Sequence, residues 1–312
     1  MPNRKITKYF RNAAHFLKHD IWNIDHRKYG GGKARGVRYL KILLVTLRGM
    51  SSHKVGLQAA ALTFFSLIAI VPFIAVVYAV TRGFGLAGEL ESIIYANFGE
   101  QEQMLQWILS FADNLLNTSK SGFFGIIGFL TFCWSIVWLM ISVEQMFNHV
   151  WQVKNDHSIP RRALAYSGFM ILSPLLILGL FMIPLSYNNF VQATGWNLTF
   201  LNSLKPVVGW FLHFVLFALL FWAAFIFIPN AKVRMLPALY AALFTALAFV
   251  VLQALYVGTQ VLVSKLNAVY GVFAALPFFM MWLNINWFLI LLGAELSFAF
   301  QNYDRYGTQH PL

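Results

Sequence analysis

The chain alternates long apolar runs with short polar connections, a pattern typical of helical membrane proteins. The run from Phe273 to Phe300 contains a single ionisable side chain, Glu295. About 20 apolar residues in a helix suffice to cross the hydrocarbon core of a bilayer, so this run predicts a membrane span. A carboxylate is costly in lipid, and we therefore expect Glu295 to face protein or a cavity.

Runs of this kind recur along the chain and predict six crossings: about 57–81, 122–146, 163–187, 206–228, 236–260 and 273–300. The expected fold is therefore all-α, a polytopic membrane protein with six transmembrane helices. Four prolines within or beside these runs are predicted to kink the helices: Pro72, Pro174, Pro184 and Pro277.

The N-terminal region has a different pattern. Residues 4–28 and 37–48 each carry apolar side chains at helical spacing with basic residues between them, and Gly30, Gly31 and Gly32 separate the two segments. This pattern favours amphipathic helices lying in the membrane interface, and basic helices packed on a soluble partner are the alternative. We predict three regions: a basic amphipathic region (1–55), a transmembrane domain (56–302) and a short cytoplasmic tail (303–312).

The composition supports a membrane protein, because 59% of the residues are hydrophobic and 11% are charged. Soluble domains average about 25% charged residues. Residues 1–58 hold 13 of the 23 Lys and Arg residues with two acids, Asp20 and Asp25. Because this basic segment leads into an apolar run, we expect it to bind membrane lipids with anionic headgroups and not nucleic acid.

The distribution of basic residues also predicts an orientation. With six crossings, 19 of the 23 Lys and Arg residues lie on the side that holds both ends of the chain. The positive-inside rule then puts both termini in the cytoplasm. The one cysteine, Cys133, lies within a predicted span and excludes an intrachain disulfide.

Four segments resemble the YihY/BrkB family of bacterial inner-membrane proteins, whose members were formerly called ribonuclease BN. They are QAAALTFFSLIAIVPF (58–73), FFGIIGFLTFCWSIVWLMISVEQMFNHVW (123–151), FIPNAKVRMLPALYAALFTALAF (227–249) and YGVFAALPFFMMWLNINWFLILLGAEL (270–296). The resemblance implies six transmembrane helices and a location in the bacterial inner membrane. It implies no settled biochemical activity.

The chemistry expected of a nuclease is missing from the sequence. The eight histidines form neither an H-x-H pair nor an HExxH motif, and few acids lie near them. The glycine run at 30–32 lacks the GK[ST] ending of a phosphate-binding loop. We therefore expect no metal, no cofactor and no enzymatic activity, and consider ribonuclease activity unlikely on these grounds.

Four polar residues in or near the predicted spans are candidates for an intramembrane polar site: Glu144, Asn148, His213 and Glu295. In the functional interpretation they form a polar site or a proton-linked gate. In the structural interpretation, which we favour, the two glutamates lock helix ends together through ion pairs. The basic residues at matching depth are Lys54, Arg162 and Arg234.

Three classes of function follow from these features. Proline-bent helices around a few polar groups favour transport or translocation of an envelope-related amphiphile or small solute. The alternative is a non-catalytic structural or assembly protein of the cell envelope, and a membrane-embedded enzyme is the third class. A polar cavity that reaches the midplane would favour transport, and a solidly packed bundle would favour the structural role.

Overall fold

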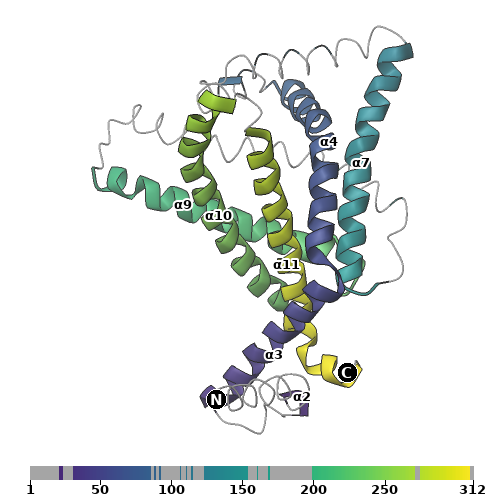
Figure 1. Ribbon diagram of the computed structural model, residues 1–312, viewed down its shortest axis with the longest axis vertical. Helices are drawn as coiled ribbons and strands as arrows, with labels where there is room; N and C mark the ends of the chain where they lie inside the picture. Colours follow the sequence, from purple (N-terminus) through teal and green to yellow (C-terminus); the bar gives the residue numbers. More distant parts are fainter. Residues whose placement is uncertain are drawn as a thin grey trace, which may run out of the picture. The chain divides into compact units, whose positions relative to one another are not determined.

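The computed structural model describes residues 21–23, 31–85, 123–153, 199–270 and 275–309, together with the single positions 88, 91, 92, 106, 110, 114, 160 and 168. Every element in this part of the chain is an α-helix (Figure 1). The helices are α2 (Ile21–Asn23), α3 (Gly31–Ser52), α4 (Val55–Gly83), α7 (Phe123–Val150), α9 (Thr199–Phe227), α10 (Met235–Tyr270) and α11 (Ala275–Gln309). The predicted all-helical class is confirmed for these residues.

The helices coincide with most of the predicted segments. The predicted crossings at 57–81, 122–146, 206–228, 236–260 and 273–300 correspond to α4, α7, α9, α10 and α11. The second amphipathic segment, 37–48, lies within α3. The predicted crossing at 163–187, with its prolines Pro174 and Pro184, and most of the segment 4–28 lie outside the described residues.

Two of the described helical segments are long and apolar enough to cross a membrane, Met235–Tyr256 and Pro277–Asp304. Their 22 and 28 residues correspond to about 33 and 42 Å of helix. The bent pair Gly32–Ser52 and Val55–Ile70 would make a third if it were counted as one span, with an angle of 59° between its two parts. The structure thus supports a membrane protein through at least two apolar helices.

Two of the four prolines that were predicted to kink helices, Pro277 and Pro72, lie in described helices. Pro277 is the third residue of α11 as the structure describes that helix, and the kink predicted there stays a prediction. Pro72 lies inside α4, which is one continuous helix from Val55 to Gly83, and its kink stays a prediction.

The chain divides into two compact units. The first contains Met1–Ala59, Met146–Lys154 and Phe217–Leu312. It thus holds α2, α3, the first turn of α4, the last turn of α7, the last three turns of α9, α10 and α11. The second contains Ala60–Gln145 and Asn155–Leu216. Within the second unit, apolar side chains buried on α4 and α7 include Leu62, Ala69, Ile136 and Val143.

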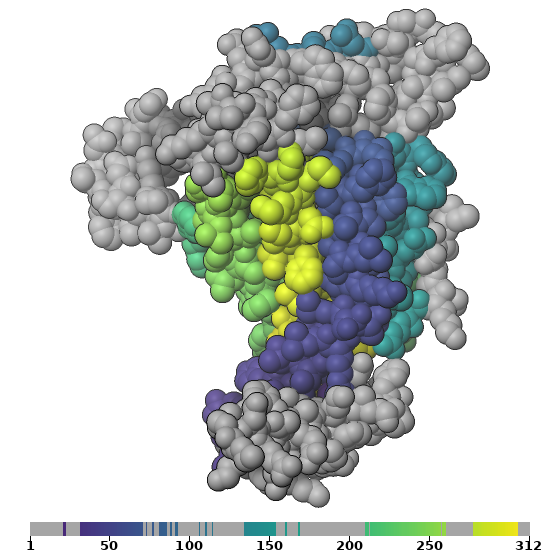
Figure 2. All heavy atoms as spheres, viewed as in Figure 1, coloured from purple at the N-terminus to yellow at the C-terminus, as the bar shows by residue number. Residues whose placement is uncertain are grey.

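The first unit is built on α11, which packs against both α10 and α3 (Figure 2). Gly293 on α11 is buried and lies against Thr245 of α10 and Phe225 of α9. The Thr245 hydroxyl donates a hydrogen bond of 2.8 Å to the Ala241 carbonyl, so this hydroxyl is satisfied within its own helix. The absence of a side chain at Gly293 therefore lets three helices meet.

The contact between α3 and α11 lies further along α11. Ile42 and Val45 of α3 are buried against Ala299, and Leu296, Phe298 and Tyr303 pack around them. The Arg38 guanidinium lies over the Tyr303 ring, 5.5 Å from its centroid. The segment that the sequence assigns to the basic peripheral region is thus packed firmly onto the last helix.

Candidate functional site

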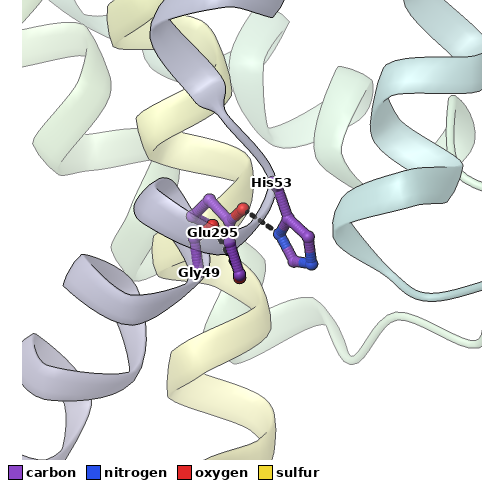
Figure 3. Close-up of polar contacts among 4 residues, drawn as sticks. Gly49, His53 and Glu295 are labelled. Atoms are coloured by element: carbon purple, nitrogen blue, oxygen red, sulfur yellow. Dashed lines mark hydrogen bonds and ion pairs between the residues drawn. The ribbon is translucent and has the colours of Figure 1, made fainter.

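Glu295 lies on the buried face of α11, between Leu291 and Ala299, which are both fully buried. Its side chain is 1% exposed, and its Oε1 atom lies 2.5 Å from Nδ1 of His53, whose side chain is 12% exposed (Figure 3). Hydrogen bonds to an ionised carboxylate are stronger than those between neutral groups, and the donor and acceptor roles here depend on the imidazole tautomer. The buried carboxylate of α11 is therefore paired with an imidazole.

His53 reaches this position because the backbone turns sharply between α3 and α4. Lys54 has a φ of 51°, a left-handed conformation that residues with a side chain rarely adopt. The N–H of His53 donates to the Gly49 carbonyl at 2.8 Å, which completes α3, and the Lys54 carbonyl accepts from the Leu57 N–H at 2.9 Å, which starts α4. The turn directs His53 towards α11 and leaves Lys54 exposed.

Gly49 lies in the last turn of α3, four residues before His53 (Figure 3). A β-carbon at this position would collide with Oε2 of Glu295. Gly49 and His53 therefore contact the two oxygens of one carboxylate: the glycine covers one, and the imidazole binds the other. This close approach depends on glycine, whose lack of a side chain allows the α3 backbone and the Glu295 carboxylate to come together.

A second histidine extends the pair. The rings of His53 and His149 lie edge to face with centroids 4.8 Å apart. His149 is in the last turn of α7 and is exposed. Partial burial lowers the pKa of His149, and the neighbouring His53 lowers it further. The three side chains thus run from a buried carboxylate to an exposed imidazole within the first unit.

Asn148, which precedes His149 in α7, makes a hydrogen bond to the turn between α9 and α10. Its side chain is buried, and its Oδ1 accepts a hydrogen bond of 2.7 Å from the Asn230 N–H in the turn between α9 and α10. The other end of this turn is held by Gln301 of α11, whose amide oxygen accepts from the Arg234 N–H at 2.8 Å and whose amide nitrogen donates to the Lys232 carbonyl at 3.0 Å. The asparagine therefore helps fix the turn to the end of α7.

The structure gives Glu295 a different partner from those predicted. Lys54 and Arg234 are exposed, and neither is paired with Glu295. Arg162 lies outside the described residues. Depth along the membrane normal suggested these partners, but the side chain that the structure places against Glu295 is that of His53. His53 was missed because the prediction chose the neighbouring Lys54 as the partner. The one indication in the sequence was that His53 lies four residues, or one helical turn, after Gly49.

The other two candidate residues belong to the second unit. Glu144 is buried on α7, and His213 is half-buried on α9. The first unit contains Glu295 and Asn148. Among the described residues, no group of three or more His, Cys, Asp or Glu side chains is arranged to hold a metal ion. The site is thus an imidazole–carboxylate pair with a second imidazole beside it.

Long apolar helices that bury an ionisable pair at a helix break are typical of a helical integral membrane protein. The chain belongs to the family described as Virulence factor BrkB, whose family model matches residues 46–311. This result confirms the resemblance to the YihY/BrkB family that the sequence motifs indicated.

Several related proteins are named UPF0761 membrane proteins. The one from Acinetobacter baylyi is 29% identical over 289 residues, which cover 88% of this chain and 66% of the relative. The one from Psychrobacter sp. is 29% identical over 269 residues, covering 82% and 48%. The one from Actinobacillus pleuropneumoniae is 27% identical over 274 residues, covering 85% and 94%.

The chain spans between about half and two thirds of the length of the first two relatives, and nearly all of the third. No solved structure matches the chain.

Proposed function

We propose that the protein translocates an envelope-related amphiphile or small solute across the bacterial inner membrane and catalyses no covalent reaction. The observation that carries this proposal is the buried pair of Glu295 and His53 at the break between α3 and α4. Ionisable groups within membrane helices are costly and commonly mark the paths of substrates and ions. Helix breaks at membrane depth favour such paths because they expose polar backbone groups to a cavity.

The alternative is a structural or assembly protein of the envelope, and one observation favours it. At Gly293 and Gly49 the helices of the first unit are packed so closely that a β-carbon would collide with a neighbour. Such packing is typical of a bundle that keeps one arrangement. In this interpretation the Glu295–His53 pair holds α3 on α11 and has no part in transport.

Reconstitution of the purified protein distinguishes the two functions. We expect proteoliposomes to move a fluorescent phospholipid between leaflets faster than protein-free liposomes do, measured as the fraction of the label that an impermeant reductant bleaches. Glu295→Gln preserves the shape of the side chain and should slow this movement while leaving the thermal midpoint close to that of the parent. A parent rate equal to that of empty liposomes would leave phospholipid translocation without support and favour the structural role.

We also propose the six-crossing topology, with residues 1–50 and 303–312 in the cytoplasm. The support is the predicted distribution of 19 of 23 Lys and Arg residues on that side. In a Cys133→Ser background, an impermeant thiol reagent added to intact spheroplasts should label Asn114→Cys, which is exposed, and spare Thr7→Cys. Permeabilised cells provide the control for reactivity at both positions. Labelling of Thr7→Cys in intact spheroplasts would contradict the topology.

We further propose that α3 lies in the cytoplasmic interface and binds anionic headgroups. Tyr39, Leu43 and Leu47 form an exposed apolar stripe on α3, at 61%, 52% and 52% exposure, and Lys33 and Arg35 are exposed near its start. An apolar stripe beside basic residues is the pattern of helices that lie in the headgroup region.

A peptide of residues 1–55 should therefore bind anionic vesicles more tightly than neutral ones. Each basic residue near the surface contributes about 1 kcal/mol, screened by salt. Centrifugation with vesicles of each composition measures the binding. Equal binding to both compositions would remove the electrostatic part of the proposal, and a peptide with Leu43→Ser and Leu47→Ser tests the apolar part separately.

A further inference from the structure

We propose that Glu295, His53 and His149 form a proton-binding site, in which one exchangeable proton is held between Glu295 and His53 and reaches solvent through His149. This inference rests on the proposed function in one respect, because it names the proton as the ion that is coupled to transport. The site itself is defined by geometry within the first unit and is measured without any transported substrate.

The first argument is the gradient of exposure along the three side chains. Glu295 is 1% exposed and His53 is 12% exposed, whereas His149 is exposed. Nδ1 of His53 is occupied by Glu295 at 2.5 Å, so the second ring nitrogen of His53 is the one available for exchange. The ring of His149 lies edge to face with that of His53 at a centroid distance of 4.8 Å, so His149 is the neighbouring ionisable group on the way to solvent.

The second argument concerns the charges around Glu295. Among the described residues, His53 is the one whose charge acts on the Glu295 carboxylate. The basic residues nearest to Gly49 in the chain are Arg48, which lies over the Trp22 ring, and Lys54, which follows α3 and is exposed. Two turns before Gly49, α3 also holds Lys41, which is buried. On α11 the next charged residue is Asp304, which is exposed.

Among the described side chains, the parts of α7, α9 and α10 in the first unit add no fixed cation. The part of α9 in the first unit has no charged residue, and that of α7 has His149 alone. The one charged residue of α10, Lys265, has a side chain outside the described set, and the turn that follows α9 holds the exposed residues Lys232 and Arg234. The group paired with Glu295 is therefore an imidazole.

The proton balance follows from this arrangement. When a neutral His53 donates its Nδ1–H to the carboxylate, the pair carries one negative charge. Uptake of one proton at the other ring nitrogen makes the pair neutral, either as imidazolium and carboxylate or, after the Nδ1 proton moves to Oε1, as imidazole and carboxylic acid. Each cycle thus changes the charge buried between α3 and α11 by one unit.

This change in charge acts on the packing of two helices. A buried uncompensated charge is unfavourable, so the deprotonated pair should weaken the contact of α3 with α11 and the protonated pair should strengthen it. Gly49 makes the coupling tight, because the α3 backbone lies directly against Oε2 of Glu295. Proton uptake would therefore favour the arrangement in which α3 is packed against α11.

Infrared difference spectroscopy of the full-length protein in lipid tests the proposal. Between acidic and alkaline buffer we expect a carboxylic-acid C=O band that titrates and that is lost in Glu295→Gln. His53→Gln should shift its titration, and His149→Gln should slow its exchange after transfer to deuterated buffer without changing the thermal midpoint. Asp304→Asn removes an exposed carboxylate from the same helix and should leave the band unchanged.

A band that persists in Glu295→Gln, or a titration that His53→Gln leaves unchanged, would overturn the proton site. If Glu295→Gln does not fold, carbon-13 labelling of glutamate carboxyls tests whether the band belongs to a glutamate, and the His53→Gln variant tests whether its titration depends on His53. A titrating band in a protein that moves no labelled phospholipid leaves the proton site standing and removes phospholipid translocation. Translocation in a protein that shows neither a titrating carboxylic-acid band nor a titrating imidazolium band removes the proton site and leaves the transport function standing.

Discussion

His53→Ala is expected to lower the free energy of unfolding by about 3 kcal/mol, since removal of one partner leaves a buried carboxylate uncompensated. Glu295 is 1% exposed, and the charge acting on it is that of His53. The measurement is the thermal midpoint of the purified protein in detergent. Lys54→Ala removes the neighbouring, exposed cation and should change the midpoint little, which makes it the matched control.

A double variant separates the lost pair from a lost shape. In His53→Leu with Glu295→Leu both polar groups are gone, and replacement of a buried pair by apolar side chains is often close to neutral. The double variant should therefore be more stable than His53→Leu alone. If His53→Ala is as stable as the parent, or if the double variant is no better than the single one, the pair contributes nothing to the contact of α3 with α11.

Gly293→Val is expected to destabilise the first unit by at least about 3 kcal/mol, at the upper end of the usual cost of overpacking. A β-carbon at Gly293 would lie 2.5 Å from Cζ of Phe225 and against the Thr245 hydroxyl. Both neighbours belong to other helices, and Phe225 is itself packed against Phe147 with ring centroids 6.1 Å apart. Because these neighbours have little freedom to move, the helices themselves must separate.

The matched control for this prediction is Gly258→Ala in α10. A β-carbon there meets no atom within 4 Å, and Gly258 is exposed. Alanine in a helix is about 0.5–1 kcal/mol more favourable than glycine, so this variant should gain stability slightly. Gly293→Ala should lie between the parent and Gly293→Val. If Gly293→Val keeps the parent's thermal midpoint, α9, α10 and α11 are packed less closely than the structure indicates.

The positions of the helices could be predicted because hydrophobicity and its period are local properties. Residues 236–260 and 273–300 are apolar over a length that crosses a bilayer, and the structure has α10 and α11 there. Pro277 shows where the same reasoning stops. A proline in an apolar run has opposite effects in the first turn and in the middle of a helix, and the pattern does not fix the first residue of the helix.

The partner of Glu295 could not be predicted for a related reason. The apolar surroundings established that the carboxylate needs a polar partner, because an unpaired charge is unfavourable in lipid. The choice among His53, Lys54 and more distant basic residues depends on the left-handed backbone of Lys54, which directs one side chain inward and leaves its neighbour exposed. Gly49 offered a hint, since it lies one turn from His53, but its contact is on another helix.

The sequence by itself therefore determined the class of protein, the family and the existence of a buried carboxylate in the last helix. These follow from the transfer free energy of side chains and from motifs that are contiguous in the chain. The tertiary structure decided that Glu295 meets His53 and Gly49, that His149 lies beside them, and that Gly293 joins three helices. Residues 49, 53, 149 and 295 come together only because of the turn after α3 and the way in which the helices pack. No local sequence pattern determines how one helix is oriented against another.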